Sequence, residues 1–440
     1  MSESSKANEE VGAFSAFSIG VGGMVGGGIF AVTGLTIELT RGAAPAAFVV
    51  AGIVALLTAY SYWRLSLYFP SKGGTVSFLN RAFGTGSITG ALNILLCLSY
   101  VILLAVYAYA FGAYGARLFG DSDYEFWKHT LITTVVLGLA VVNYFGAEYA
   151  IRSENFMNVA KMLILAVFVI VGLSTPMDWS RMAGEHWVGP VELIAGAMVI
   201  FLNYEGFELI ANAGKGIRSP RRSLPIAYFG GVVMVIVFYV LISSVVVGHL
   251  SFSEVAAHGD YSLSTTANRF MGKAGSIMVI VAALLATSSA INATFYGSGR
   301  LTYVIAKSGE LPLELERSIR GQPLEGMIIF AGLTLVMANF VPLAAIATMG
   351  SAGFLLIFLA VNLANVKLAK ETKSLRWISI LAAMSCLVAV VALCGKTVIN
   401  VETRSQIWVL VGMVAVSILV EVGYRRASGR KIRVTFGEDP

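Results

Sequence analysis

Three ionisable side chains stand inside long apolar stretches of this sequence. Lys161 lies in one stretch, and Glu205 and Glu208 lie three residues apart in another. A carboxylate at the centre of a bilayer costs roughly 2.5 to 3.5 kcal/mol even on a lenient insertion scale. A desolvated amine or carboxyl that gains and loses a proton can couple a proton gradient to another process. The alternatives are that Lys161 snorkels toward the headgroups and that Glu208 is a structural acid.

A second candidate site is formed by backbone rather than by side chains. Residues 18–30 hold six glycines in an otherwise apolar run, and Gly26, Gly27 and Gly28 are consecutive. Each glycine costs a helix interior roughly 1 kcal/mol relative to alanine, so we expect the helix to open there. Opened backbone at membrane depth is tolerated where it is buried in protein or lines a cavity, and there a polar ligand can bind it. Close packing through GxxxG spacings is the alternative.

The stretch 201–208 interrupts another apolar span with two carboxylates, an asparagine and a glycine. We expect this helix to open as well, which would let Glu205 and Glu208 point in different directions. Glu205, nearer the break, could meet a cationic group of a ligand or carry a proton. Phe201 and Tyr204 could shape or gate a pocket beside the break.

Other kinds of chemistry find little support. In a span near 272–300, Ser288 and Ser289 could ligate an ion or hold a water, although serine is also common where membrane helices pack. The four histidines are scattered at or beyond helix ends, the cysteines form no CxxC pair, and the sequence has no GxxxxGK[ST] phosphate loop. The sequence therefore predicts no enzyme, no metal and no cofactor. Without a phosphate loop for ATP, the energy for any uphill transport must come from an ion gradient.

The composition places these residues in an all-α polytopic membrane protein. The 440 residues are 57% hydrophobic and 13% charged, which is more apolar surface than a soluble domain of this size can bury. Twelve helical spans can be placed, near 13–37, 43–68, 86–116, 129–147, 155–174, 190–213, 225–249, 272–300, 325–343, 346–368, 376–394 and 406–424. The polar stretches between them are short, so the function must lie within the helix bundle.

The basic residues indicate an orientation. With the N-terminus in the cytoplasm, the inner segments hold 22 Lys and Arg residues and the outer segments hold 8, which satisfies the positive-inside rule. Both termini are therefore expected in the cytoplasm. The net charge of +6 follows from this distribution, so we predict the lipid bilayer and not nucleic acid as a partner.

Interrupted helices at the first and sixth positions, with five helices in each half, predict an inverted five-plus-five repeat. The ligand is expected where the two breaks meet. The predicted parts are a cytoplasmic tail at 1–12, a first repeat at 13–174, a second repeat at 190–368, two further helices at 376–424, and a basic cytoplasmic tail at 425–440.

Three motifs in consistent order cover most of the chain. They are Gly-Gly-Gly-Ile-Phe at 26–30, Tyr-Glu-Gly-Phe-Glu at 204–208 with the basic, proline-containing loop 215–225, and the stretch 288–303 with its continuation 306–312. Together they resemble the amino acid-polyamine-organocation family of permeases. The resemblance implies a leucine-transporter-like fold with helices 1 and 6 unwound, and secondary transport by alternating access.

The resemblance also implies a site. The implied substrate-binding residues are Met24, Gly26, Gly27, Gly28, Ile29, Phe201, Leu202, Tyr204 and Glu205. Backbone N–H groups of the three glycines would hold a substrate carboxylate, and carbonyl groups beside both breaks would hold its amine. Lys161 matches a fifth-helix lysine that replaces a sodium ion in proton-coupled members, so the implied proton-coupling residues are Lys161, Glu205 and Glu208.

The sequence thus predicts a proton-coupled amino acid symporter of the inner (cytoplasmic) membrane. Two departures from the family pattern leave the substrate open: Glu205 stands where many members have a neutral residue, and Gly214 and Lys215 stand where an acidic pair is often found. The first alternative is an amine, polyamine or cationic amino acid permease or exchanger of the same fold. The second is a channel or solute sensor.

Overall fold

The computed structural model describes residues 11–71, 73–120, 122–145, 148–307, 324–399, 404 and 406–428. Within these residues the chain is helical and has no β-strand. Two isolated bridges join Val11 to Ile217 and Arg41 to Trp187. Most of both expected tails lies outside the described residues.

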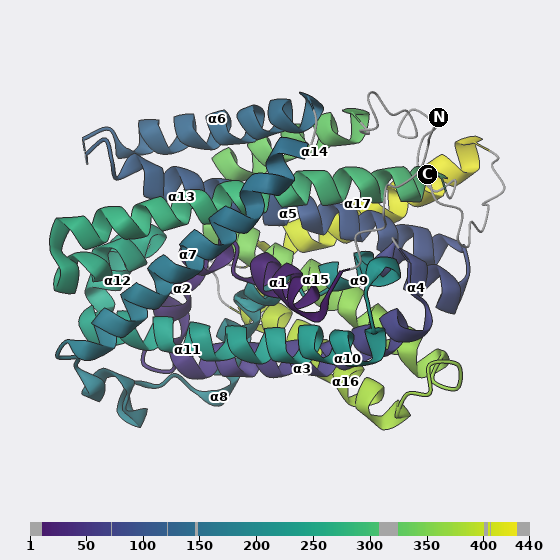
Figure 1. Cartoon of the computed structure of the whole chain (residues 1–440), viewed down its shortest axis with the longest axis horizontal. Helices are drawn as coiled ribbons and strands as arrows, with labels where there is room; N and C mark the ends of the chain where they lie inside the picture. The colour runs from purple at the N-terminus through teal and green to yellow at the C-terminus, as the bar shows by residue number, and fades with distance from the viewer. Residues whose placement is uncertain are drawn as a thin grey trace, which may run out of the picture.

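The elements carry the labels of Figure 1. The α-helices are α1 (Ala13–Met24), α2 (Gly28–Thr40), α3 (Ala44–Tyr68), α4 (Gly74–Phe83), α5 (Ser87–Ala116), α6 (Tyr124–Phe145), α7 (Glu148–Ser174), α8 (Pro190–Val199), α9 (Leu209–Asn212), α10 (Pro220–Pro225), α11 (Gly231–His249), α12 (Phe252–His258), α13 (Ser262–Lys307), α14 (Leu324–Phe340), α15 (Leu343–Lys367), α16 (Arg376–Ile399) and α17 (Gln406–Ser428). The short turns are η1 (Trp179–Met182), η2 (Gly184–His186), η3 (Phe201–Tyr204), η4 (Gly214–Gly216), η5 (Ile226–Gly230) and η6 (Gly259–Tyr261).

Proline and glycine set several helix boundaries. Pro45, Pro190 and Pro220 occupy the first turn of α3, α8 and α10. Backbone N–H groups in the first turn have no intrahelical acceptor, so the N–H that proline lacks is not missed there by the helix's own hydrogen bonds. Pro225 ends α10, and the π-helical turn η5 follows because proline cannot donate the next helical hydrogen bond. Gly272, with φ of 62°, interrupts α13 at the residue where the sequence placed the start of the eighth span.

The helices confirm a multi-pass membrane protein. Among the described residues, nine helices are long and apolar enough to cross a membrane, and there are up to eleven such spans if each of two bent helix pairs counts as one. The remaining expected span corresponds to α14, whose apolar part Glu325–Phe340 is shorter. The count of twelve and the inverted repeat stay predictions.

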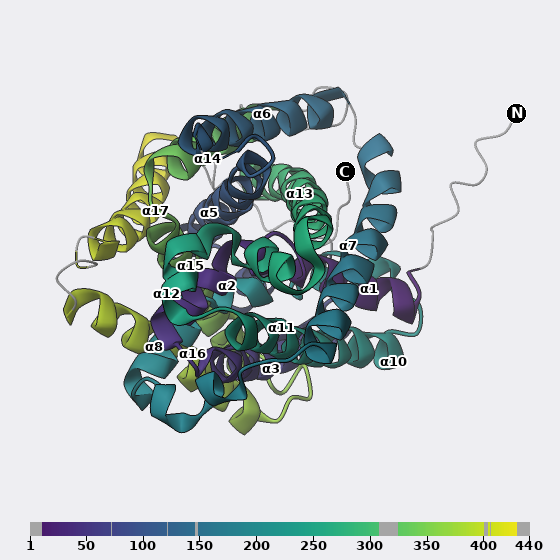
Figure 2. The same cartoon turned by 90° about the vertical axis from the view of Figure 1, so that its left-hand side faces the viewer.

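The long helices run roughly along the longest axis of the molecule (Figure 1). The α12 helix lies at one end of this bundle and α4 lies at the other, and we call these the α12 end and the α4 end. Viewed from the α12 end, α2 and α15 lie inside a ring that includes α3, α5, α11 and α13 (Figure 2). Residues at the start of α2 are therefore enclosed by helices from both halves of the chain.

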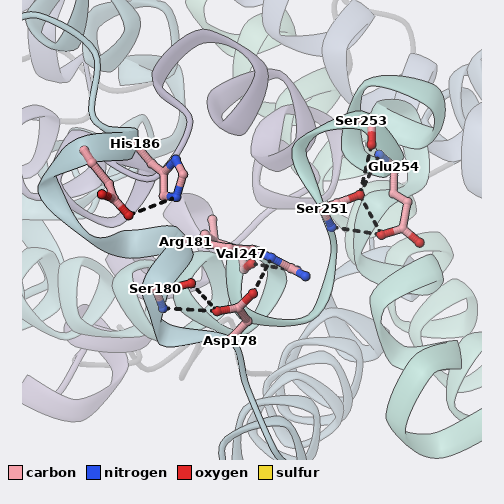
Figure 3. Close-up of polar contacts among 9 residues, drawn as sticks. Asp178, Ser180, Arg181, His186, Val247, Ser251, Ser253 and Glu254 are labelled. Atoms are coloured by element: carbon pink, nitrogen blue, oxygen red, sulfur yellow. Dashed lines mark hydrogen bonds and ion pairs between the residues drawn. The ribbon is translucent and has the colours of Figure 1, made fainter.

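At the α12 end, the loop between α7 and α8 is tied to the end of α11 (Figure 3). The Asp178 N–H donates to the Gly248 carbonyl at 2.9 Å, and the Arg181 guanidinium donates to the Val247 carbonyl at 3.5 Å. The hydrogen bond from the Ser180 hydroxyl, helped by the charge of Arg181, holds the pKa of the Asp178 carboxyl below its usual range. Asp178 is thus charged at neutral pH and can order this loop.

The α12 helix begins with a capping box formed by Ser251 and Glu254 (Figure 3). The Glu254 N–H donates to the Ser251 hydroxyl at 3.3 Å, and the Ser251 N–H donates to the Glu254 carboxylate at 2.9 Å. The following turn, η6, lies directly on α2, since a Cβ added at Gly34 would be 2.2 Å from the Gly259 carbonyl oxygen. This contact closes the α12 end over α2.

Candidate functional site

Both helix breaks that the sequence predicts are present. Helix α1 ends at Met24 and α2 begins at Gly28, with a bend of 49° between them. The sixth expected span is divided into α8, η3 and α9, with a bend of 52°. The broken segments are buried, so their freed N–H and C=O groups need partners inside the protein or on a ligand.

The two breaks touch through glycine backbone. A Cβ added at Gly206 would lie 2.4 Å from the Gly23 carbonyl carbon and 2.5 Å from the Met24 nitrogen. Gly206 also has φ of 121°, a conformation that residues with a side chain rarely adopt. Glycine at these positions therefore lets the first and sixth spans cross in direct contact.

Side chains from α7 and α11 cap the carbonyl end of α1. The Lys161 ammonium donates to the Gly22 carbonyl at 3.1 Å, and Lys161 is 1% exposed. The Tyr239 hydroxyl donates to the Met24 carbonyl at 2.6 Å and also lies 3.2 Å from the Asn203 carbonyl oxygen. A helix C-terminus carries unpaired carbonyls and partial negative charge, which an ammonium stabilises. Lys161 thus lies at the first break and does not snorkel to an exposed position.

The N-terminal end of α2 presents backbone donors to the same region. The first N–H groups of a helix have no intrahelical acceptor and form the positive end of its dipole. In α2 these groups belong to Gly28, Ile29 and Phe30, and they follow Gly26 and Gly27 in the break. All five residues are buried. Such an end suits an anion as small as a carboxylate.

Three side chains outside the predicted site pack on these glycines. A Cβ added at Gly27 would lie 2.7 Å from Thr287 Cγ2 and 2.8 Å from Tyr107 Cδ1, and one added at Gly28 would lie 2.3 Å from Asn203 Oδ1. Neither polar side-chain atom of Asn203 has a hydrogen-bond partner among the described residues. The sequence signal for Asn203 was an amide inside the second interrupted stretch, where a buried polar group calls for a partner.

The second break is held by Ser351 of α15. The Ser351 hydroxyl accepts a hydrogen bond from the Leu202 N–H at 3.0 Å and donates one to the Val199 carbonyl at 2.8 Å. The Leu202 carbonyl accepts a hydrogen bond from the Glu205 N–H at 3.1 Å, and a role of this carbonyl in binding an amine stays a prediction. The carbonyl of this break that faces α11 is that of Asn203.

We expect Ser351→Ala to lower the free energy of unfolding by about 1 to 3 kcal/mol, because two buried backbone groups lose their partner. Denaturant titration in detergent micelles measures this loss. Thr348→Ala on the same helix is the control, since the Thr348 hydroxyl bonds to the Ala344 carbonyl of its own helix at 2.7 Å. Equal stability of the two variants would contradict a bridging role for Ser351.

The two carboxylates have different surroundings. Glu208 Oε2 accepts from the Gly206 N–H at 2.7 Å, and Oε1 accepts from the Tyr100 hydroxyl at 3.3 Å. Glu205 is 1% exposed, and neither of its oxygens has a hydrogen-bond partner in the described part of the chain. Glu208 stabilises its own break, whereas the Glu205 carboxyl remains available to a ligand or a proton.

The predicted aromatic residues form walls around the breaks. The Tyr204 hydroxyl donates to the Phe48 carbonyl at 2.6 Å, and its ring lies 5.6 Å from that of Tyr239, measured between centroids. The Phe201 ring lies 5.8 Å from that of Phe358 on α15. Both rings are fully buried and fixed by neighbours in this conformation.

The two serines predicted to hold an ion or a water lie on α13. Ser289 is buried and Ser288 is half-buried. The α13 atoms nearest to the glycines belong instead to Thr287, at Gly27, and to Ala290, at Gly26. An ion or water site at Ser288 and Ser289 stays a prediction.

The breaks are closed from both ends of the bundle. Toward the α4 end, Tyr62 packs edge-on against Phe207 and Phe358, with centroid distances of 5.4 Å and 5.6 Å. Toward the α12 end, η6 covers α2. Met24 and Leu202, beside the two breaks, are each 1% exposed. The two breaks therefore meet inside the protein and are covered from both ends of the bundle.

Comparison with known proteins identifies the family of this chain. A family model described as amino acid permease matches residues 11–418, which include both breaks and Lys161. The chain belongs to the amino acid permease family. This membership confirms the resemblance found in the motifs. Members of the family are transporters rather than enzymes, so transport of amino acids across a membrane is the general function that membership supports.

The permease is similar to its relatives along most of its length. It is 33% identical over 365 residues to an uncharacterized protein of Methanocaldococcus jannaschii, covering 83% of this chain and 84% of that protein. It is 29% identical over 432 residues to the inner membrane transport protein YbaT of Escherichia coli, covering 96% and 98%. It is 25% identical over 448 residues to the methylthioribose transporter of Bacillus subtilis, covering 93% of each.

Proposed function

We propose that this permease is a proton-coupled symporter that imports amino acids by alternating access. The observation that carries the proposal is the buried Lys161 ammonium, bonded to the carbonyl end of α1 at the first break. A proton on this amine places a positive charge against the negative end of the α1 dipole. Loss of the proton removes that charge and frees α1 to move relative to α7, which opens the site toward one side.

The substrate binds where the two breaks meet. Its carboxylate accepts from the N–H groups at the start of α2, beside the Asn203 amide. Its ammonium donates to the Met24 and Asn203 carbonyls, which flank the Tyr239 hydroxyl. A hydroxyl carries a single proton, so Tyr239 can satisfy only one of these carbonyls at a time and leaves the other for the substrate.

The proposal places the α4 end and both termini in the cytoplasm. The excess of Lys and Arg in the segments assigned to that side supports this orientation. The name of the relative YbaT, an inner membrane transport protein, supports the cytoplasmic membrane as the location.

Uptake by purified protein in proteoliposomes tests the proposal. With the outside one pH unit more acidic, each proton supplies about 1.36 kcal/mol, which supports about tenfold accumulation of substrate for one proton per amino acid. We expect radiolabelled amino acids to accumulate toward this ratio of internal to external concentration. In control vesicles whose pH gradient is collapsed with a proton ionophore, we expect the ratio to stay near one. Equilibration without accumulation in the untreated vesicles would instead indicate a channel, and uptake only against an internal substrate would indicate an exchanger.

A second candidate function is transport of an amine or a cationic amino acid. The observation that favours it is the Glu205 carboxyl, which is buried without a hydrogen-bond partner among the described residues and could pair with a cationic group. The same vesicles distinguish the two functions when decarboxylated analogues of the amino acids are supplied outside them. Uptake that persists on the analogues and is lost on the parent amino acids would favour the amine carrier.

A further inference from the structure

A set of buried polar side chains lines the contact between α3, α15 and α16. The set consists of Thr58, Ser61, Asn362, Asn365, Ser379 and Cys386, all of them fully buried. Within each helix the members are three or seven positions apart, so they lie on one face and follow each other along the bundle. We call this set the polar file.

The first layer of the polar file lies near the second break. The Asn362 amide donates to the Thr58 hydroxyl oxygen at 3.1 Å and to the Cys386 sulfur at 3.6 Å. Phe358, one helical turn before Asn362 on α15, contacts Phe201 and Phe207 on either side of Glu205, with centroid distances of 5.8 Å and 5.3 Å. Both Glu205 oxygens and the Asn362 Oδ1 atom have no hydrogen-bond partner among the described residues. This end of the file therefore has unused capacity to accept hydrogen bonds.

The second layer continues to the turn between α15 and α16 at the α4 end. The Asn365 amide donates to the Ser379 hydroxyl oxygen at 2.8 Å, and the Ser61 hydroxyl donates to the same oxygen at 3.4 Å. The Asn365 Oδ1 atom accepts from the hydroxyls of Thr372 at 3.0 Å and Ser374 at 3.1 Å. Ser374 is only half-buried. The file thus extends from the surroundings of Glu205 to the molecular surface.

Several other ionisable groups belong to the segments around Glu205. Glu208 follows it in the same segment and is bonded to Tyr100 of α5, Tyr62 of α3 packs on Phe207, and Tyr107 of α5 packs on Gly27. The cation of this region, Lys161, donates to the Gly22 carbonyl, and neither Glu205 oxygen has a hydrogen-bond partner in the described part of the chain. An ionised carboxylate is costly to bury without a cation, so Glu205 needs a proton, and that proton needs a route.

Polar side chains between membrane helices can also serve packing alone. Packing alone leaves the unpartnered acceptors of Glu205 and Asn362 unexplained, because a buried acceptor without a donor is destabilising. We propose that the polar file carries protons between the Glu205 carboxyl and the surface at the α4 end. This inference rests on the proposed proton coupling and adds to it a route separate from Lys161.

Each step of this route conserves protons. Hydroxyl and thiol groups both donate and accept, so they can pass a proton on, whereas the two asparagine amides hold their neighbours and bridging waters in place. When the Glu205 carboxyl gives up its proton and becomes a carboxylate, one proton leaves to water beside Ser374. Each hydroxyl between them accepts one proton and passes one on. Its number of protons is therefore unchanged, and only the direction of its O–H bond changes.

Variants of the file in proteoliposomes test the inference. Asn362→Leu removes the bridging amide, and the milder pair Ser61→Ala with Ser379→Ala serves if that variant does not fold. Asn143→Leu is the matched control, since the Asn143 amide donates to Asn292 at 2.7 Å between α6 and α13, away from the file. We expect about a tenfold lower initial rate of pH-driven uptake in the file variants, and substrate counterflow at equal pH within about twofold of the parent.

Counterflow is the informative comparison because exchange returns the protonated, loaded carrier without releasing its proton. Unchanged pH-driven uptake in the file variants would overturn the inference and leave the proposed symport standing. Parallel loss of uptake and counterflow would assign the file to packing and also overturn it. Absence of pH-driven uptake in the parent protein would overturn the proposed coupling and the route together.

Discussion

Replacing Lys161 with alanine should abolish pH-driven accumulation while leaving substrate exchange measurable. The ammonium is buried against the Gly22 carbonyl, so its removal deletes the group that gains and loses the coupling proton at the first break. At a gradient of one pH unit, the accumulation ratio should fall from about ten to about one. Radiolabelled uptake and counterflow in proteoliposomes measure the two activities separately. Removal of a buried charge also relieves its desolvation, so the variant should remain folded.

The control for Lys161→Ala is a second buried lysine. Lys128 on α6 is 6% exposed and pairs with Glu125 at 2.7 Å near the α12 end, away from both breaks. Lys128→Ala should retain pH-driven accumulation. Accumulation by Lys161→Ala that matches Lys128→Ala would exclude Lys161 as the coupling group and leave Glu205 as the remaining candidate.

Replacing Gly206 with alanine should lower the free energy of unfolding by more than Ser351→Ala does. The new Cβ would lie 2.4 Å from the Gly23 carbonyl carbon, and the backbone at φ of 121° disfavours any side chain. Overpacking and backbone strain each cost about 1 to 3 kcal/mol. We therefore expect the free energy of unfolding in detergent micelles to fall by about 3 kcal/mol or more, or the two spans to separate with loss of substrate binding.

Gly138→Ala is the matched control for Gly206→Ala. Gly138 lies within α6, and a Cβ added there would meet no atom within 4 Å. Alanine favours a helix interior over glycine by up to about 1 kcal/mol, so this variant should be as stable as the parent or slightly more stable. A loss of stability at Gly206→Ala no larger than at Gly138→Ala would show that the contact with Gly23 adapts easily.

The local sequence was sufficient to predict the two breaks. Three consecutive glycines at Gly26 to Gly28 and the polar stretch around Glu205 are unfavourable inside an apolar helix wherever it packs, so their effect does not depend on the rest of the fold. The short helix α4 was not predicted, because its ten residues mix polar and apolar side chains and form no membrane-length span. The sequence also left two interpretations of Lys161, since a lysine near a helix end can either snorkel or be buried.

What the amino-acid sequence determined by itself is a membrane bundle with two opened helices and a few ionisable groups that must find partners. The tertiary structure decided which partners they find: Gly206 against Gly23, Lys161 on the Gly22 carbonyl, and Ser351 across the second break. These pairs join segments far apart in the chain. Helix faces that meet protein and faces that meet lipid are equally apolar, so hydrophobic periodicity does not reveal which faces come together. Only the packed bundle does so.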